Sequence, residues 1–170
     1  MEFSDLIRQR YSVRAYRPVP VEDEKLQRIL EAARLAPTAA NRQAFQIIVI
    51  HTAGREAELK RIYKADFFTQ APIVLAAIGE PAKNWIRRDQ SNYNYLDVGI
   101  VMDHVILAAT NEGLGTCWIG AFDPDAARAV LGLPKEVEPI AFTPLGYAAD
   151  AGPARKQRKP LPELVRYEHW

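Results

Sequence analysis

The sequence predicts one layered domain of the α/β or α+β class, with helices on both faces of a single sheet. Segments with apolar residues at helical spacing alternate with short apolar runs rich in β-branched residues. The connections between the runs are long and helical, as they are in layered folds. The chain has 170 residues, which is enough for one domain with a sizeable core.

Two helices are expected near the N-terminus. Apolar residues at helical spacing predict a short amphipathic helix over residues 2–10 and a second helix over about 22–35. The Pro-punctuated segment RPVPVED links them. Pro37 ends the second helix, because the residue before a proline is disfavoured in the α region.

Two strands and a helix follow. FQIIVI (45–50) is rich in β-branched residues and predicts a strand. Helical spacing of apolar residues then predicts a helix over 54–64. PIVLAAIG (72–79) is an apolar run of strand length, which we expect to be buried on both faces.

The longest predicted element is a helix over about 91–113. Its apolar residues leave little polar face, which predicts burial on all sides. In a chain of 170 residues, such a helix indicates a subunit interface as well as a core.

The remaining elements are a short strand, a capped helix and a strand that contains prolines. GTCWIG (115–120) predicts the short strand. Asp123 supplies a cap oxygen and Pro124 suits the first helical position, so a helix begins there and ends at Gly132. VEPIAFTPLGYA (137–148) contains two prolines and should therefore lie at a sheet edge or carry a bulge.

The composition excludes several classes of protein. The chain has 22 basic and 21 acidic residues, so no global attraction to nucleic acid or membrane is expected. Cys117 is the single cysteine, which rules out an intrachain disulfide and favours a reducing compartment. The N-terminus lacks the apolar run of a secretory signal, and no apolar segment is long enough to cross a bilayer without charges. We therefore expect a cytoplasmic protein.

Common catalytic and metal motifs are absent. The sequence has no CxxC, HExxH or P-loop, and its three histidines (His51, His104 and His169) lack metal-ligand spacing. GLGTCWIG places Trp118 where a dinucleotide fingerprint needs a third glycine, and it leads into a strand, so it is not such a fingerprint. Cys117 is not expected to be a nucleophile, since no histidine or helix N-terminus lies near it in the sequence.

A basic segment near the N-terminus is the first candidate site. RQRYSVRAYR (8–17) contains four arginines in a chain of net charge +1. If this segment is extended, Arg10, Ser12 and Arg14 project from one face and together suit a phosphate or another oxyanion. A solvated basic surface, or salt bridges to the acidic stretch 22–24, would explain the same residues.

A second basic cluster lies in the C-terminal tail, which is polar and cannot form a core of its own. The cluster comprises Arg155, Lys156, Arg158 and Lys159, and it could simply be solvated. If the fold brings both basic clusters together, they form one anion pocket.

The segment APTAANRQAFQ (36–46) is the third candidate. Thr38, Asn41 and Gln43 are neutral hydrogen-bonding residues that suit the rim of a ligand site. The alternative is a loop whose polar side chains bond to its own backbone.

Taken together, these segments resemble the nitroreductase family of flavin enzymes. The resemblance covers most of the chain and rests on RQRYSVRAY, APTAANRQAF, LGTCWIG, PLGYA and KQRKPLPELVRYE in this order. The chain has Thr38 where the family often has serine, which keeps the hydroxyl. It has Ala44-Phe45 where the family often has Pro-Trp, and loss of the proline should loosen the loop slightly.

The resemblance implies a three-layer α/β/α sandwich of the α+β class with a central mixed, largely antiparallel sheet. Residues 1–170 would form a single FMN-binding domain, with 151–170 extending onto the partner subunit of a homodimer. FMN would bind non-covalently at two equivalent sites. The implied cofactor-binding residues are Arg10, Tyr11, Ser12, Arg14, Pro37, Thr38, Ala39, Asn41, Gln43, Ile119, Gly120, Ala121, Lys156 and Arg158.

The resemblance also gives these residues different roles. The FMN phosphate would be held by Arg10, Ser12, Lys156 and Arg158. Arg14 would lie near the N1–O2 edge of the isoalloxazine, where a cation favours the anionic reduced flavin. A backbone N–H near Gly120 would reach flavin N5, and the 37–41 segment would come from the other subunit.

The implied activity is that of an NAD(P)H-dependent flavin oxidoreductase. NAD(P)H would donate hydride to flavin N5, and a small conjugated acceptor such as a nitroaromatic or quinone would take electrons in a ping-pong mechanism. No protein nucleophile, metal, nucleic acid or membrane is required. Aromatic residues in 64–70 and 84–95, namely Phe67, Phe68, Trp85, Tyr93 and Tyr95, could line the acceptor pocket or serve ordinary packing.

Other functions fit the same residues. Some relatives use reduced FMN for dehalogenation or flavin breakdown. A flavin-binding carrier or regulatory protein without useful turnover would need the same arginines. A binding module for a phosphorylated metabolite is a third alternative. Neither the acceptor nor the choice between NADH and NADPH follows from the sequence.

Overall fold

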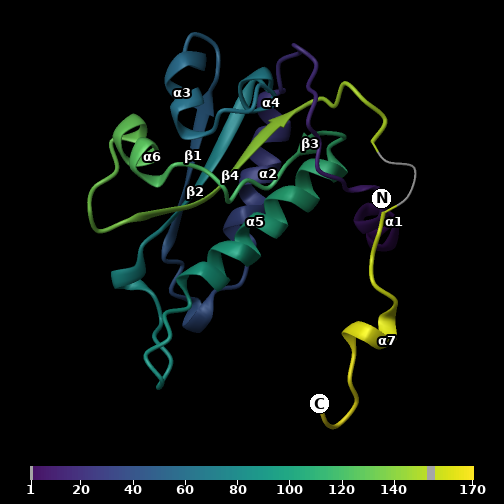
Figure 1. Cartoon of the computed structure of the whole chain (residues 1–170), viewed down its shortest axis with the longest axis vertical. Helices are drawn as coiled ribbons and strands as arrows, with labels where there is room; N and C mark the ends of the chain where they lie inside the picture. The colour runs from purple at the N-terminus through teal and green to yellow at the C-terminus, as the bar shows by residue number, and fades with distance from the viewer. Residues whose placement is uncertain (1, 153–155) are drawn as a thin grey trace.

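The computed structural model describes residues 2–152 and 156–170 and contains one sheet between two layers of helices (Figure 1). The sheet has four strands in the order β1-β2-β4-β3, and all neighbouring strands are antiparallel. Among the described residues, the one parallel pairing is an isolated bridge between Ser12 and Thr116. The predicted three-layer sandwich with a largely antiparallel sheet is therefore confirmed. The strands are β1 (Phe45–His51), β2 (Ile73–Gly79), β3 (Gly115–Thr116) and β4 (Glu138–Gly146).

The helices divide between the two faces of the sheet. Helices α2 (Asp23–Leu35) and α5 (Asn94–Asn111) cover one face, and α1 (Phe3–Gln9) contacts α5. The other face is covered by α3 (Glu56–Ile62), α4 (Phe67–Gln70) and α6 (Pro124–Leu131). Short helical turns complete the chain: η1 (Ala39–Asn41), η2 (Pro81–Lys83) and α7 (Leu161–Leu164).

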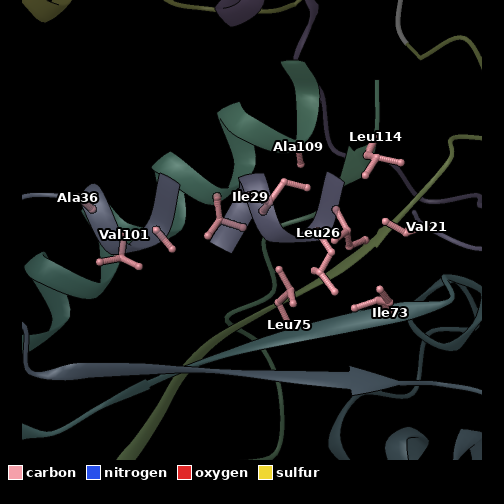
Figure 2. Close-up of a cluster of buried hydrophobic side chains, with 12 residues drawn as sticks. Val21, Leu26, Ile29, Ala36, Ile73, Leu75, Val101, Ala109 and Leu114 are labelled. Atoms are coloured by element: carbon pink, nitrogen blue, oxygen red, sulfur yellow. The ribbon is translucent and has the colours of Figure 1, made fainter. Parts of the chain in front are cut away.

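Strand β2 joins the two halves of the core. Every residue of β2 is buried, as its uninterrupted apolar sequence predicts. On one face, Leu75 belongs to a cluster with Leu26 and Ile29 of α2 and Val101 of α5 (Figure 2). On the other face, the neighbouring Val74 packs in a second cluster with Phe68 of α4. The alternation of side chains along a strand explains this division.

Helix α6 begins and ends at the residues that the sequence predicts. The Asp123 side chain accepts hydrogen bonds from the backbone N–H groups of Asp125 (3.0 Å) and Ala126 (2.9 Å). Pro124 is the first helical residue, and Gly132 adopts the left-handed conformation that commonly follows a helix.

Strand β3 is shorter than predicted, and strand β4 agrees with one of its two predicted alternatives. Strand β3 has only two residues, and the chain pairs with β4 again at Ile119, opposite Phe142. The backbone N–H of Cys117 donates to the Thr143 hydroxyl (3.1 Å), which interrupts the ladder. Strand β4 lies inside the sheet and not at an edge, and the alternative expectation of a bulge is confirmed by a register shift opposite Ala77 and Ile78.

Helix α5 is not buried on all sides within one chain, and burial of its exposed side at a subunit interface stays a prediction. Tyr95 and Leu96 are 64% and 54% exposed, and Ile100 and Leu107 on the same side are only partly buried. The exposed stripe is therefore largely apolar, with Asp103 exposed among its apolar residues and the Tyr95 hydroxyl bonded to Glu138.

The C-terminal tail extends away from the three layers (Figure 1). Its large apolar side chains are more than half exposed, namely Leu161, Leu164, Tyr167 and Trp170. Over the described residues, no helix is both long and apolar enough to span a membrane.

Candidate functional site

The segment after α1 is extended and is fixed by two pairings. Ser12 forms a bridge with Thr116 of β3, and Tyr16 forms one with Ala148 after β4. Val13 and Tyr16 are buried, whereas Arg14 is exposed. Gly115 is required for this arrangement, because a Cβ there would lie 2.5 Å from Val13 Cγ2. The segment is therefore extended, which is the condition under which Arg10, Ser12 and Arg14 are predicted to project from one face.

Tyr11 connects this segment to the start of the tail. Its hydroxyl donates to the Asp150 carboxylate (2.8 Å) and to the Asp150 carbonyl oxygen (2.9 Å). Gly152 has a φ of 68° and packs on the Tyr11 ring so closely that a Cβ would lie 2.6 Å from Tyr11 Cζ. Burial, reinforced by Asp150, raises the pKa of Tyr11 to about 12. We call these contacts of Tyr11, Asp150 and Gly152 the tail latch.

The latch directs the tail back over the basic segment and forms a cationic cleft of about 660 Å³. Lys156 Nζ donates to the carbonyl oxygen of Ile7 at the end of α1. The two basic clusters, which are far apart in the sequence, thus come together. The described residues that line the cationic cleft are Arg10, Tyr11, Ser12, Arg14, Asp150, Ala151, Gly152, Lys156, Gln157 and Arg158. Arg155 of the predicted basic tail lies outside the described residues.

The charges in the cleft are not neutralised by carboxylates. Within residues 2–152 and 156–170, no ion pair involves Arg10, Arg14, Lys156 or Arg158, and Asp150 is engaged by Tyr11. Glu22 of the acidic stretch pairs with Lys25 instead. Burial, together with the charges of Arg10 and Arg158, lowers the pKa of Lys156. Cations that line one cleft without forming ion pairs suit an anion chemically.

Cys117 lies behind the cleft. Its side chain is buried, and burial raises the pKa of the thiol, although Arg14, Ser12 and Arg10 act in the opposite direction. The thiol therefore stays protonated near neutral pH, in agreement with the sequence-based exclusion of a nucleophile.

The third candidate segment forms a compact loop, the rim loop (residues 37–44). Ala40, Asn41 and Gln43 have φ values of 50°, 54° and 51°, in the left-handed region. Such residues each cost on the order of 1 kcal/mol or more and cluster at functional sites. The Thr38 hydroxyl accepts from the backbone N–H of Gln43 (3.0 Å), so it supports the loop. The Asn41 and Gln43 side chains bond to each other (3.2 Å) and are exposed.

The rim loop and the cationic cleft are far apart within one chain. The N–H of Ala39 donates to Asp97 near the start of α5, whereas Thr110 near its end lines a small cavity with Arg10. A rise of about 1.5 Å per residue places these two points about 20 Å apart. The predicted site residues therefore fall into two groups that one chain does not bring together.

The segment 119–121 contains one buried and two exposed residues. Ile119 is buried and pairs with Phe142, while Gly120 and Ala121 are exposed. A Cβ at Gly120 would meet only Trp118 Nε1, at 3.9 Å, and the φ of Gly120 is not positive. Local structure therefore does not require glycine at position 120. Because glycine has no side chain, a ligand can approach the backbone closely there.

The aromatic residues near the predicted acceptor pocket are largely used in packing. Phe68 is fully buried and makes edge contacts with Tyr63 and Phe142, so it belongs to the core. Trp85 and Tyr93 pack edge to face, with centroids 4.9 Å apart. For these residues the structure supports the packing alternative.

Sequence reasoning missed several residues that build the two groups. Asp150 and Gly152 are needed for the tail latch, and Asn94 and Asp97 hold the rim loop. The residues that they contact in the tail latch and the rim loop lie 50 or more residues away in the sequence. No local sequence pattern therefore predicts these contacts. No cluster of His, Cys, Asp and Glu that could hold a metal ion occurs in the part of the chain that the structure describes.

The fold and the cleft define a three-layer α+β protein with a cationic cleft built from both ends of the chain. The family model described as "Putative TM nitroreductase" matches residues 2–170. The chain belongs to the nitroreductase family.

Individual relatives agree with this assignment. A putative NADH dehydrogenase/NAD(P)H nitroreductase from Archaeoglobus fulgidus is 32% identical over 151 residues, which covers 85% of this chain and 84% of the relative. A nitroreductase family protein from Clostridium difficile 630 has a crystal structure with 36% identity, full coverage of both chains and a TM-score of 0.88. An FMN-dependent nitroreductase from Clostridium difficile R20291 is similar at 25% identity and a TM-score of 0.81, covering 97% of this chain and 98% of that one.

Proposed function

We propose that this protein is an NAD(P)H-dependent flavin oxidoreductase that binds FMN at two equivalent sites between the subunits of a homodimer. The cationic cleft carries this proposal, because Arg10 and Arg158 both line it and neither pairs with a carboxylate of the described residues. A phosphate monoester carries nearly two negative charges at neutral pH and suits such a cleft. The names of the relatives, which include an NAD(P)H nitroreductase and an FMN-dependent nitroreductase, support the same function.

The residues of the cleft fit the phosphate and one end of FMN. Arg10, Lys156 and Arg158 supply charge for the phosphate, and Ser12 supplies a hydroxyl. Arg14 lies in the same cleft and would place a positive charge beside the ring system. Tyr11 serves the site through the tail latch, since its hydroxyl is already bonded to Asp150.

The other half of the site would come from the second subunit. The rim loop would supply Pro37, Thr38, Ala39, Asn41 and Gln43, since this loop contacts α5 at Asp97, about 20 Å along the helix from Thr110 beside Arg10. Ile119, Gly120 and Ala121 would run past the flavin ring, with the exposed Gly120 backbone at its edge. When bound, FMN would supply hydride and electron transfer between NAD(P)H and a small conjugated acceptor.

Three exposed features support a homodimer. The apolar stripe of α5 contains Gly99, where a Cβ would meet nothing within 4 Å, which leaves room for a close helix contact. The apolar side chains of the tail have no cover within the described residues. Strand β1 is an open sheet edge beside a groove of about 460 Å³, lined in part by Leu30, Phe45 and Ile47. The tail would extend onto the partner subunit and cover such surfaces.

The test is spectroscopic. Purified protein incubated with FMN should retain a flavin absorbance spectrum after gel filtration, at one FMN per subunit. Anaerobic NADH or NADPH should bleach the spectrum, and menadione or a nitroaromatic should restore it. Protein that stays colourless with excess FMN contradicts the proposal. Protein that binds FMN but is bleached by neither nucleotide is a carrier and not a reductase.

A further inference from the structure

The rim loop is held at both ends by the first turn of α5. At its start, the backbone N–H of Ala39 donates to Asp97 Oδ1 (3.0 Å). At its end, the carbonyl oxygen of Ala44 accepts from Asn94 Nδ2 (2.9 Å) and from the backbone N–H of Glu80 (3.0 Å). Asn94 and Asp97 are three residues apart and therefore lie on the same side of the helix. One rigid element thus fixes the distance between the two ends of the loop.

Both anchoring side chains are buried at some cost to stability. Asn94 is 1% exposed and Asp97 is 3% exposed. Asn94 Oδ1 and Asp97 Oδ2 are buried without a hydrogen-bond partner among the described residues. An unpartnered buried oxygen is unfavourable, above all on a carboxylate. Residues that break a local rule of this kind occur mainly where function requires them.

Strand β2 leaves room for the Asn94 side chain at its last residue, Gly79. A Cβ at Gly79 would lie 1.9 Å from Asn94 Oδ1, which is closer than any real Cβ contact, so only glycine fits beside Asn94 in its present position. Gly79 is thus part of the anchor at the end of the loop, although it does not contact the loop through a side chain.

The backbone between the anchors is in a conformation that a free loop would not keep. Three residues of the loop that are not glycine have positive φ values, and such residues persist only where the surrounding structure fixes them. The internal bond from the Gln43 N–H to the Thr38 hydroxyl spans the same turn and does not reach the rest of the protein. The side-chain bonds to Asp97 and Asn94, together with the backbone bond from Glu80 to Ala44, therefore connect this strained loop to the core.

We propose that Asn94 and Asp97 form a clamp that keeps the rim loop in its ligand-binding conformation, with Asp97 as a positioning residue for FMN in the cleft of the second subunit. Asp97 does not touch the ligand and acts through the backbone of Ala39. The role toward FMN rests on the proposed function, whereas the clamp itself does not.

The test compares Asp97→Leu and Asp97→Asn with Asp125→Asn in the full chain. Asp125 is also an acidic residue in the first turn of a helix, but it is exposed, so its replacement controls for loss of charge near a helix N-terminus. Two quantities are measured: hydrogen exchange in peptides that cover the rim loop, and the Kd for FMN. Asp97→Asn retains an acceptor oxygen and serves as the milder variant if Asp97→Leu does not fold.

We expect exchange in the rim loop to accelerate and the FMN Kd to rise, each by about tenfold or more in Asp97→Leu and by less in Asp97→Asn. Asp125→Asn should change neither quantity. In an Asn41→Ala background, Asp97→Asn should weaken FMN binding by a smaller factor, because both changes act through the same loop.

The outcomes separate the clamp from the proposed function. Unchanged exchange in both Asp97 variants overturns the clamp, whether or not FMN binds. Faster exchange with an unchanged FMN Kd overturns the positioning role. If the unsubstituted protein binds no FMN, the proposed function and the positioning role fail, while the exchange rates still decide on the clamp.

Discussion

The cationic cleft and the rim loop would hold the same ligand by different physical means. The cleft gathers exposed and partly buried charges from both ends of the chain, and its geometry depends on a few contacts such as the hydrogen bond from Tyr11 to Asp150. The rim loop is short and strained, and buried side chains of one helix hold it. The cleft therefore offers long-range attraction that salt can screen, and the rim loop offers fixed, neutral hydrogen-bonding groups.

The largest expected effect concerns the charges of the cleft. Arg10→Ala and Arg158→Ala should each weaken FMN binding by about 1.5–3 kcal/mol, because each removes a charge-assisted hydrogen bond. The Kd, measured by quenching of FMN fluorescence, should also become less sensitive to salt in both variants. Arg17→Ala is the matched control, since Arg17 is exposed in the same segment but does not line the cleft. Equal Kd values for all four proteins would place the phosphate elsewhere.

A smaller effect is expected from the tail latch. Tyr11→Phe removes the hydroxyl that bonds to Asp150 and keeps the ring that packs on Gly152. The loss of this hydrogen bond should cost about 1 kcal/mol and weaken FMN binding several-fold by releasing the start of the tail. Tyr147→Phe, which removes an exposed hydroxyl bond to Glu22, should not change the Kd. If both variants bind FMN equally well, the tail latch does not position the tail cations.

The smallest expected effect is a dependence of FMN affinity on pH. The pKa of Lys156 is lowered in the free protein, first by burial and then by Arg10 and Arg158. A bound phosphate would raise this pKa, so binding takes up a proton and affinity should fall as pH rises through the lowered value. The phosphate is already doubly ionised above about pH 7 and adds no dependence there.

The stability of the free protein should respond to pH in the opposite sense. A lysine with a lowered folded pKa binds fewer protons in the folded state, so the free energy of unfolding rises with pH between the folded and unfolded pKa values. Lys156→Arg keeps its charge throughout this range and should flatten both profiles. FMN titrations and urea unfolding between about pH 7 and pH 10 measure both quantities. Identical slopes for Lys and Arg at this position would exclude Lys156 as the titrating group.

Local sequence chemistry predicted the elements of the fold that depend on neighbouring residues. The cap at Asp123, the first turn at Pro124 and the stop at Gly132 need only adjacent backbone groups, and all three occur as predicted. Strand β4 was predicted less well, since its place inside the sheet depends on strands elsewhere in the chain. Its two prolines indicated the bulge but could not tell which strands would lie beside it.

The same division applies to the candidate site. The residue types of the basic segment predicted an anion site, and the structure places them with Lys156 and Arg158 in one cleft. The sequence could not predict that the Tyr11 hydroxyl is used by Asp150, 139 residues away. The role of Asp97 could not be predicted from its place in a helix that is apolar nearly all round. This role depends on the backbone of Ala39, 58 residues earlier.

Heterodimers test most directly whether one site combines the cleft of one subunit with the rim loop of the other. One subunit carries Arg10→Ala and Arg158→Ala, the other carries Thr38→Ala and Asn41→Ala, and each homodimer alone should bind FMN poorly. In the mixed dimer, one of the two sites would combine an unaltered cleft with an unaltered loop, so we predict tight binding of one FMN per dimer. Weak binding at both sites of the mixed dimer would mean that each site is built within a single chain, which contradicts our account.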